Sequence, residues 1–235
     1  MRKQTISKYL SSYATKKHKA YMEKLIPHVD RDRIMGVPSP IVKRAARDLY
    51  YSKGIEKLRG FLDDIPHFFI EESNTHAYIL NCIEDIELQY YEIDKFLPEV
   101  DNWWTCDVLK VSSPINEPHD LFLQEHINKW LKSEDLYAVR FEIVTTMNHY
   151  LQERFDRKHL DAIVAVNSGD YFYLHSAVAW FFCTALIFQW DEVLPYMTEH
   201  KLPKLTHNYV IIKCRDSTRI SDERKKLLDL LIRKR

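Results

Sequence analysis

Two adjacent tryptophans and an aspartate near the middle of the chain have the residue types and the spacing of a site for a cationic group. Trp103 and Asp107 are four residues apart, so on a helix their side chains lie on one face. An indole ring attracts positive charge through its π face, and a carboxylate attracts it directly. A core tryptophan beside a solvated aspartate has the same spacing. The pair is therefore a candidate site only if the rest of the chain supports it.

The pair lies in a chain whose composition predicts an all-α fold. Only four glycines occur in 235 residues, which is few for a β-sandwich or for an α/β fold with glycine-rich phosphate loops. Neither a Gly-x-Gly-x-x-Gly sequence nor a P-loop is present, which excludes the common nucleotide-binding folds. Asp101 or Asn102 is a natural N-cap for a helix that carries Trp103.

Helices of ordinary length are predicted along the whole sequence, in one domain. Residues 1–37 are predicted to form one helix, from Thr5 to Ile26, followed by an irregular segment. Residues 38–235 are predicted to form helical pairs joined by short turns. The predicted helices lie at about 38–53, 55–65, 71–85, 91–97, 103–111, 119–132, 135–151, 157–167, 170–188, 190–199, 203–214 and 222–233.

A weak internal repeat predicts how these pairs are arranged. The sequence from Ser133 to Arg140 resembles the sequence from Ser168 to His175 at an offset of 35 residues. A period near 35 to 40 residues with two helices per unit is typical of a HEAT-like solenoid, whose concave face is a binding surface. Superposed units would bring Trp103 and Asp107 close to Arg140 and to Trp180.

The charges are unevenly distributed although the net charge is zero. Counted from the sequence, residues 1–60 hold 15 Lys and Arg against 5 Asp and Glu, and residues 61–136 hold 4 against 17. This asymmetry indicates a positively charged surface on the N-terminal part, although solvated helix faces could cluster in the same way.

The cysteines, histidines and apolar runs predict no cofactor, no metal and no membrane contact. Cys82, Cys106, Cys183 and Cys214 are widely spaced, as is usual for reduced thiols in a cytoplasmic protein. No His-x-x-x-His ligand pair stands with a nearby carboxylate motif. No apolar run approaches the roughly 20 residues of a membrane span, and the N-terminus lacks a signal-peptide pattern. We expect a monomer.

Several short sequences, in order and at matching separations, resemble one known family. They are Met35-Gly36-Val37-Pro38-Ser39-Pro40 before a basic helix, Val100-Asp101-Asn102-Trp103 with Asp107, Val139-Arg140-Phe141, Ala177-Val178-Ala179-Trp180 and Leu205-Thr206-His207-Asn208. The chain resembles the AlkD-like DNA alkylation repair proteins, which are bacterial HEAT-like-repeat DNA glycosylases. The resemblance covers nearly the whole chain. No single motif is specific, and the resemblance rests on the order and the separations of the motifs.

The resemblance implies a substrate, a reaction and a role for each site residue. The family removes N3- and N7-alkylated purines from duplex DNA without flipping the base into a pocket. Asp107 would stabilise the sugar cation and position the attacking water, and Trp103 and Trp180 would cradle the deoxyribose. Positively charged side chains would hold DNA phosphates: Arg140, Lys43, Arg44 and Arg47. The protein would act on bacterial DNA at the nucleoid.

Two differences from the family favour an alternative function. Cys183 stands where the glycosylases have an arginine three positions after the second tryptophan. The single helix predicted for Thr5 to Ile26 also replaces two helices that precede the Met-Gly-Val turn in the family. The alternative is a HEAT-like module that captures damaged or branched DNA without excising common alkylpurines. A helical-repeat protein that binds a protein partner is a further alternative, against which the basic N-terminal part argues.

Overall fold

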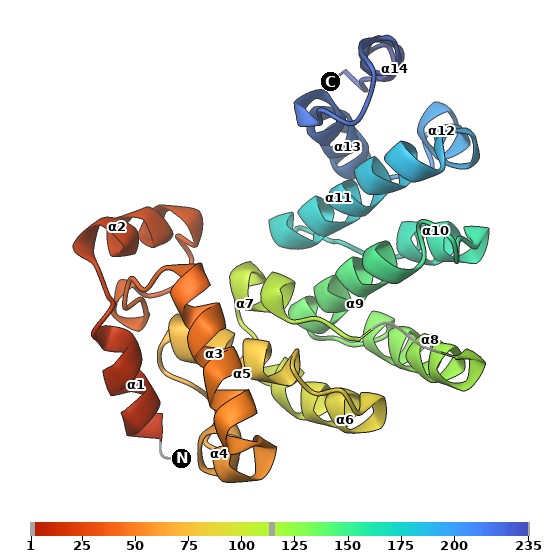
Figure 1. Ribbon diagram of the computed structural model, residues 1–235. Coiled ribbons are helices and arrows are strands. Elements are labelled where there is room, and N and C mark those ends of the chain that lie inside the picture. The colour runs from red at the N-terminus through yellow and green to blue at the C-terminus, as the bar shows by residue number, and fades with distance from the viewer. Residues whose placement is uncertain (1–2, 113–115, 235) are drawn as a thin grey trace. The chain divides into compact units, whose positions relative to one another are not determined.

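The structure, a computed structural model, describes residues 3–112 and 116–234, and over these residues it contains helices and no strand (Figure 1). The prediction of an all-α fold is therefore confirmed. The chain divides into two compact units, Met1–Leu121 and Phe122–Arg235, with the boundary inside helix α8 (Glu117–Leu131).

Unit 1 is built around one helix whose buried side chains are mostly polar. Its helices are α1 (Lys3–Ser11), α2 (Lys16–Leu25), α3 (Ser39–Lys53), α4 (Ile55–Leu62), α5 (Ile70–Leu80), α6 (Ile86–Phe96) and α7 (Trp103–Val108), with short 3-10 helices at Arg31–Arg33 and Leu97–Glu99. Helix α5 packs against α1, α3, α6 and α7. All its residues from Ile70 to Ala77 are buried, including Glu71, Glu72 and Asn74. Buried polar groups are stable when they are hydrogen-bonded, so α5 joins its neighbours through specific polar contacts.

The prediction of one helix from Thr5 to Ile26 is wrong, because the chain breaks between α1 and α2. The hydroxyl of Thr15 caps α2 by accepting a hydrogen bond from the backbone N–H of His18 at 3.1 Å. The backbone N–H of Thr15 donates to the carbonyl of Gly36 at 2.9 Å, a distant contact that fixes the break. Two helices therefore precede the Met-Gly-Val turn, and the difference from the family that rested on a missing helix disappears.

The Met35-Gly36-Val37 turn is held by a buried carboxylate of α5. The backbone N–H groups of all three residues donate to Glu71, at 3.0, 2.7 and 3.2 Å respectively. Gly36 has a φ of +91°, and a Cβ there would lie 2.7 Å from both the Lys19 Cβ and the Thr15 carbonyl oxygen. The turn thus joins α2, α5 and the start of α3 at one point.

Unit 2 consists of paired helices in two rows. After most of α8 come α9 (Leu136–His149), α10 (Arg157–Val164), α11 (Phe172–Phe188), α12 (Trp190–Thr198), α13 (Lys204–Asp216) and α14 (Asp222–Asp229). Helix α11 packs on α9 and on α13. Figure 1 shows these three helices as one row, with α10 and α12 in a second row beside it. The helices whose starts resemble each other in sequence, α9 and α11, are therefore neighbours, as a repeat requires.

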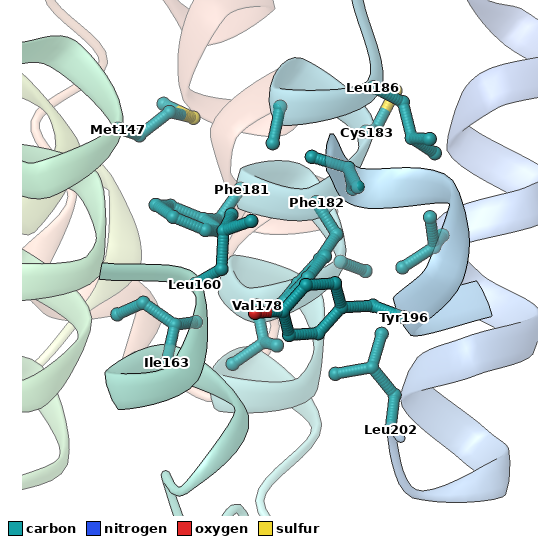
Figure 2. Packing of buried hydrophobic residues seen from close by; sticks show 14 of the residues in the cluster. Met147, Leu160, Ile163, Val178, Phe181, Phe182, Cys183, Leu186, Tyr196 and Leu202 are labelled. Atoms are coloured by element: carbon teal, nitrogen blue, oxygen red, sulfur yellow. The ribbon is translucent and has the colours of Figure 1, made fainter. Parts of the chain in front are cut away.

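The core of unit 2 is formed around α11, which is apolar on almost every side. Figure 2 shows Phe181 and Phe182 of α11 packed between residues of α10 and α12, among them Leu160, Ile163 and Tyr196. A helix that is apolar all round needs neighbours on all sides to remove its side chains from water. The packing of α11 therefore fixes the positions of α9 and α13, which carry candidate site residues and motif residues.

Candidate active site

The residue pair Trp103 and Asp107 lies on α7, a short helix fixed at its start by a capping network. The side chain of Asn102 accepts from the backbone N–H of Thr105 at 2.9 Å, and its amide donates to the Thr105 hydroxyl at 3.0 Å. That hydroxyl donates to Asn74 of α5 at 2.8 Å. All three side chains are buried, so α7 is anchored to the centre of unit 1.

A second anchor lies at the residue before the cap. Asp101 forms an ion pair with Arg33, whose Nε also donates to the carbonyl of Phe68 at 3.1 Å. Burial alone would raise the pKa of Asp101, but the hydrogen bonds from Arg33 and Asn102 hold it below its usual value. The Val-Asp-Asn-Trp motif therefore positions α7 through Asp101 and Asn102.

The chain just after Asp107 is held by Asn81 at the end of α5. The amide of Asn81 donates to the carbonyl of Val108 at 2.7 Å, and its oxygen accepts from the backbone N–H of Lys110 at 2.8 Å. These two bonds bracket the residues that follow Asp107. The aspartate is thus held between a cap on its N-terminal side and this contact on its C-terminal side.

Asp107 lines a cleft together with two of the predicted phosphate-binding residues. The cleft has a volume of about 490 Å³ and lies wholly in unit 1. Its lining includes Lys43, Arg47 and Tyr51 of α3, which are spaced four residues apart, and Lys110 beyond α7. An i, i+4, i+8 spacing places the three α3 side chains in a row on one face of the helix.

The charge around this cleft is predominantly positive. Three cationic side chains, Lys43, Arg47 and Lys110, line it together with two carboxylates, Asp107 and Glu84. Burial raises the pKa of the Cys82 thiol in the wall, while the charges of Arg47 and Lys43 act in the opposite direction. The cleft therefore combines three cationic side chains with the carboxylates of Glu84 and of Asp107, whose helix is fixed at both ends.

Trp103 and Arg44 lie outside the lining of that cleft. The Trp103 indole donates through Nε1 to the carbonyl of Leu25 at 3.3 Å and packs partly buried against the cluster that contains Trp104. Arg44 is exposed on another face of α3. The hydrogen bond with Tyr13 and burial raise the pKa of Tyr9 on α1, and the nearby guanidinium of Arg44 opposes that rise.

The remaining predicted site residues belong to unit 2. Trp180 on α11 is 38% exposed, so it is a surface residue although it stands in an apolar run. Arg140 on α9 is only 5% exposed, and its Nη1 donates to the carbonyl of Tyr173 at 2.7 Å. Cys183, which stands where the resemblance implies an arginine, is buried, and a hydrogen bond with the Cys214 thiol lowers its pKa, with Lys213 and Arg219 acting in the same direction.

The last of the motifs has a structural role. Thr206 is hydrogen-bonded to Nδ1 of His175 at 2.6 Å, and the other ring nitrogen of His175 lies 3.0 Å from the carbonyl of Gly169. His207 is fully buried, with Nε2 2.8 Å from the carbonyl of Leu231. Asn208 bonds to the backbone of Arg233 at 3.1 Å through both its oxygen and its nitrogen. These residues join α11, α13 and the C-terminal segment.

Comparison with known proteins shows the family to which these helical pairs belong. A family model described as DNA alkylation repair enzyme matches residues 6–213. The chain belongs to the DNA alkylation repair enzyme family. The match runs from within α1 to most of α13, and the HEAT-like helical repeat predicted from the sequence is the fold of this family. A comparison with curated proteins found no match.

Several residues of the candidate site are missing from the sequence-based prediction. Asn81 and Lys110 enter the cleft through tertiary contacts, Asn74 supports α7 from inside α5, and Tyr51 lies one helical turn beyond Arg47 on α3. The i, i+4 spacing from Arg47 could have indicated Tyr51.

The described residues contain neither a candidate metal site nor a helix that could span a membrane. Over residues 3–112 and 116–234, no group of three His, Cys, Asp or Glu side chains could hold a metal ion. Within the same ranges, no helix has the length and apolar character to cross a membrane.

Proposed function

We propose that the protein is a DNA N-glycosylase that hydrolyses the glycosidic bond of N3- and N7-alkylated purines in duplex DNA. The observation that carries this proposal is the cleft in which Asp107 lies with Lys43 and Arg47. Membership of a DNA alkylation repair family supports DNA as the substrate. The cations bind phosphates without reading sequence, and the carboxylate supplies the negative charge that the reaction needs.

The reaction begins at a base that already carries positive charge. When the bond between C1′ and the base nitrogen breaks, its electron pair goes to the base, which leaves as a neutral molecule. Positive charge then develops on the deoxyribose. The Asp107 carboxylate stabilises this oxocarbenium-like sugar, as carboxylates do in glycoside hydrolases. Water adds to C1′ and passes a proton to Asp107, from which it returns to solvent.

The other predicted residues position DNA around that step. Trp103 and Trp180 offer π faces to the positively charged sugar. Lys43, Arg44, Arg47 and Arg140 hold backbone phosphates. For Arg140 this role requires its guanidinium to leave the carbonyl of Tyr173 or to share it with a phosphate oxygen. The protein then acts as a monomer with no organic cofactor.

The first prediction concerns Asp107→Asn, tested by the release of 7-methylguanine and 3-methyladenine from methylated duplex DNA at excess protein. We expect the rate to fall by about 100-fold or more, because an amide cannot balance the charge of the sugar cation. Glu84→Gln is the matched control, since Glu84 is the other carboxylate in the cleft. We expect the control to keep its rate within a few fold.

If Asp107→Asn and Glu84→Gln release the bases at equal rates, Asp107 has no catalytic role. A wild type that releases no base, yet binds DNA more weakly as salt is added, would instead support the alternative of a DNA-capturing module. The residue type at position 183 favours that alternative, because a cysteine stands where the resemblance implies an arginine that contacts the DNA backbone.

A further inference from the structure

A cavity in unit 2 is built from residues that the proposed reaction does not use. It lies between α8 and α10 and reaches α9, with a volume of about 300 Å³. This size is at the lower end of the range for small-molecule sites. Ile127 and Leu131 of α8 and Ala162 and Ile163 of α10 give it apolar walls. The cavity therefore suits a small ligand with an apolar body.

One polar side chain of α9 enters this cavity with an unused oxygen. Glu142 is 1% exposed and lines the cavity. The hydroxyl of Thr146 donates to its Oε1 at 2.5 Å, while its Oε2 has no hydrogen-bond partner among the residues that the structure describes. Buried polar atoms are nearly always hydrogen-bonded, so this oxygen is a place where a ligand would gain a bond.

The surroundings of Glu142 favour its neutral form. Burial raises the pKa of Glu142 to about 8, and the hydrogen bond from Thr146 only partly opposes this rise. A carboxylic acid both donates and accepts a hydrogen bond.

The charge of the lining selects a neutral ligand over a cation. The titratable groups that α10 adds are Lys158 and His159, while α8 adds the amides of Gln124 and Asn128. The Lys158 ammonium is held by Gln124 at 3.1 Å and by Asp156 at 3.1 Å. A positively charged ligand would meet this ammonium without meeting a carboxylate, unless Glu142 lost its proton.

We propose that this cavity binds a free nucleobase that carries an amino group beside a ring nitrogen, such as adenine. The Oε2–H of Glu142 donates to the ring nitrogen, and Oε1, which also accepts from the Thr146 hydroxyl, accepts from the amino group with its second lone pair. The ring lies between the apolar side chains of α8 and α10. The site is built from different residues than the cleft of unit 1 and needs no DNA, so it stands apart from the proposed excision.

The test is calorimetric titration of the full chain with adenine, beside unsubstituted purine as the matched ligand. We expect one saturable site for adenine. Purine should bind at least about tenfold more weakly, because it lacks the amino donor. The affinity for adenine should be constant between pH 6 and 7 and should fall as the pH rises through about 8, where Glu142 loses its proton.

Three variants place the site in the cavity. Glu142→Leu removes both hydrogen bonds, and Ala162→Phe fills the cavity while keeping the carboxyl group, so each should weaken adenine binding by about tenfold or more. Glu125→Leu makes the same chemical change on the exposed face of α8 and should bind as the wild type does. Far-UV circular dichroism checks that each variant is folded.

Several results would overturn the proposal. They are the absence of a saturable site for adenine, equal affinity for purine and adenine, and unchanged affinity in Ala162→Phe. Binding of methylamine with an affinity that increases up to pH 8 would assign the cavity to a cation instead. If Glu142→Leu does not fold, the comparison of adenine with purine and the affinity of Ala162→Phe for adenine still test the proposal. Asp107→Asn should bind adenine normally, so a failure of excision is distinguishable from a failure of this site.

Discussion

At the scale of residues, the sequence motifs have two kinds of role. Asp107, Lys43 and Arg47 line the cleft directly. Other motif residues stabilise the backbone. Gly36 allows a tight turn, Asn102 caps α7, and His207 makes a buried contact with the C-terminal segment. A motif can therefore mark a family without touching its substrate.

Gly36 allows a sharp prediction, since Gly54 offers a matched control. Both residues have positive φ, but a Cβ meets close backbone atoms only at Gly36, whereas at Gly54 nothing lies within 4 Å. We expect Gly36→Ala to lower the free energy of unfolding by about 3 kcal/mol or more, from strain and clash together. Gly54→Ala should cost only about 1 kcal/mol, the cost of the strained φ. Urea unfolding of both variants measures this difference, and similar losses would contradict the packing of the turn.

The buried acid Glu142 predicts a pH-dependent stability. Its folded pKa of about 8 lies above the ordinary value of 4.5, so the folded state holds a proton that the unfolded state releases. The free energy of unfolding therefore falls as the pH rises from 4.5 through 8. Glu142→Gln removes this dependence. Between pH 4.5 and pH 7 the wild type should lose roughly 3 kcal/mol of its free energy of unfolding relative to the variant.

Urea unfolding at several pH values checks this prediction. Glu125→Gln, an exposed carboxyl on α8, is the control and should leave the pH profile unchanged. A wild-type profile parallel to that of Glu142→Gln would mean that Glu142 titrates normally.

Spacing singled out Trp103 with Asp107, and the family resemblance added Lys43, but neither could indicate residues that enter by tertiary contact. Asn81 joins the site through a bond to a carbonyl 27 residues away. The exposure of Trp180 and the burial of Arg140 also depend on neighbouring helices, so an apolar run and a lone arginine gave no indication of either.

At the scale of elements, most predicted helices have an observed counterpart, but two boundaries are wrong. The helix predicted at 71–85 ends at Leu80, and the one predicted at 91–97 begins at Ile86, where Asp85 caps α6. The amphipathic pattern runs from α1 into α2, and the break between them depends on the carbonyl of Gly36. Helix α5 was predicted, but its burial was not, because a polar sequence such as Glu-Glu-Ser-Asn-Thr normally faces water. Periodicity reports one face of a helix, and it cannot show that every face is covered.

The short helix α7 depends on its cap, which predicts an effect on activity. Asn102→Ala removes the side-chain bonds to Thr105 and should lower the free energy of unfolding by about 1 to 2 kcal/mol. Excision should fall much further than DNA binding, because Asp107 moves with α7. Asp85→Ala removes the equivalent cap of α6 and is the control. Excision lost equally in both variants would attribute the effect to general instability.

At the scale of the whole molecule, the zero net charge conceals a basic N-terminal part and an acidic middle part. The basic side chains of α3 that line the cleft come from the basic part. For DNA binding, local charge matters more than the total, because each phosphate contact releases counterions from the duplex.

A DNA-binding role for the basic residues of α3 predicts how DNA binding depends on salt. Lys43→Ala and Arg47→Ala should each reduce the slope of log affinity against log salt concentration by about one unit. Lys226→Ala, an exposed cation on α14, should leave the slope unchanged. Binding isotherms at several salt concentrations give the slopes, and the same slope for all three variants would exclude the α3 row from DNA contact.

The hydrogen bonds between Glu71 and the Met-Gly-Val turn also bear on the entropy of the proposed DNA binding. Three successive N–H groups around a carboxylate form the kind of pocket in which many proteins bind a phosphate. Here the anion is part of the chain, so the turn becomes ordered during folding and does not wait for DNA. Helix α3 starts directly after this turn, so its basic row is in place before any encounter. If this row binds DNA as proposed, the entropic cost of ordering it is met during folding, so more of the phosphate attraction would remain for holding the duplex.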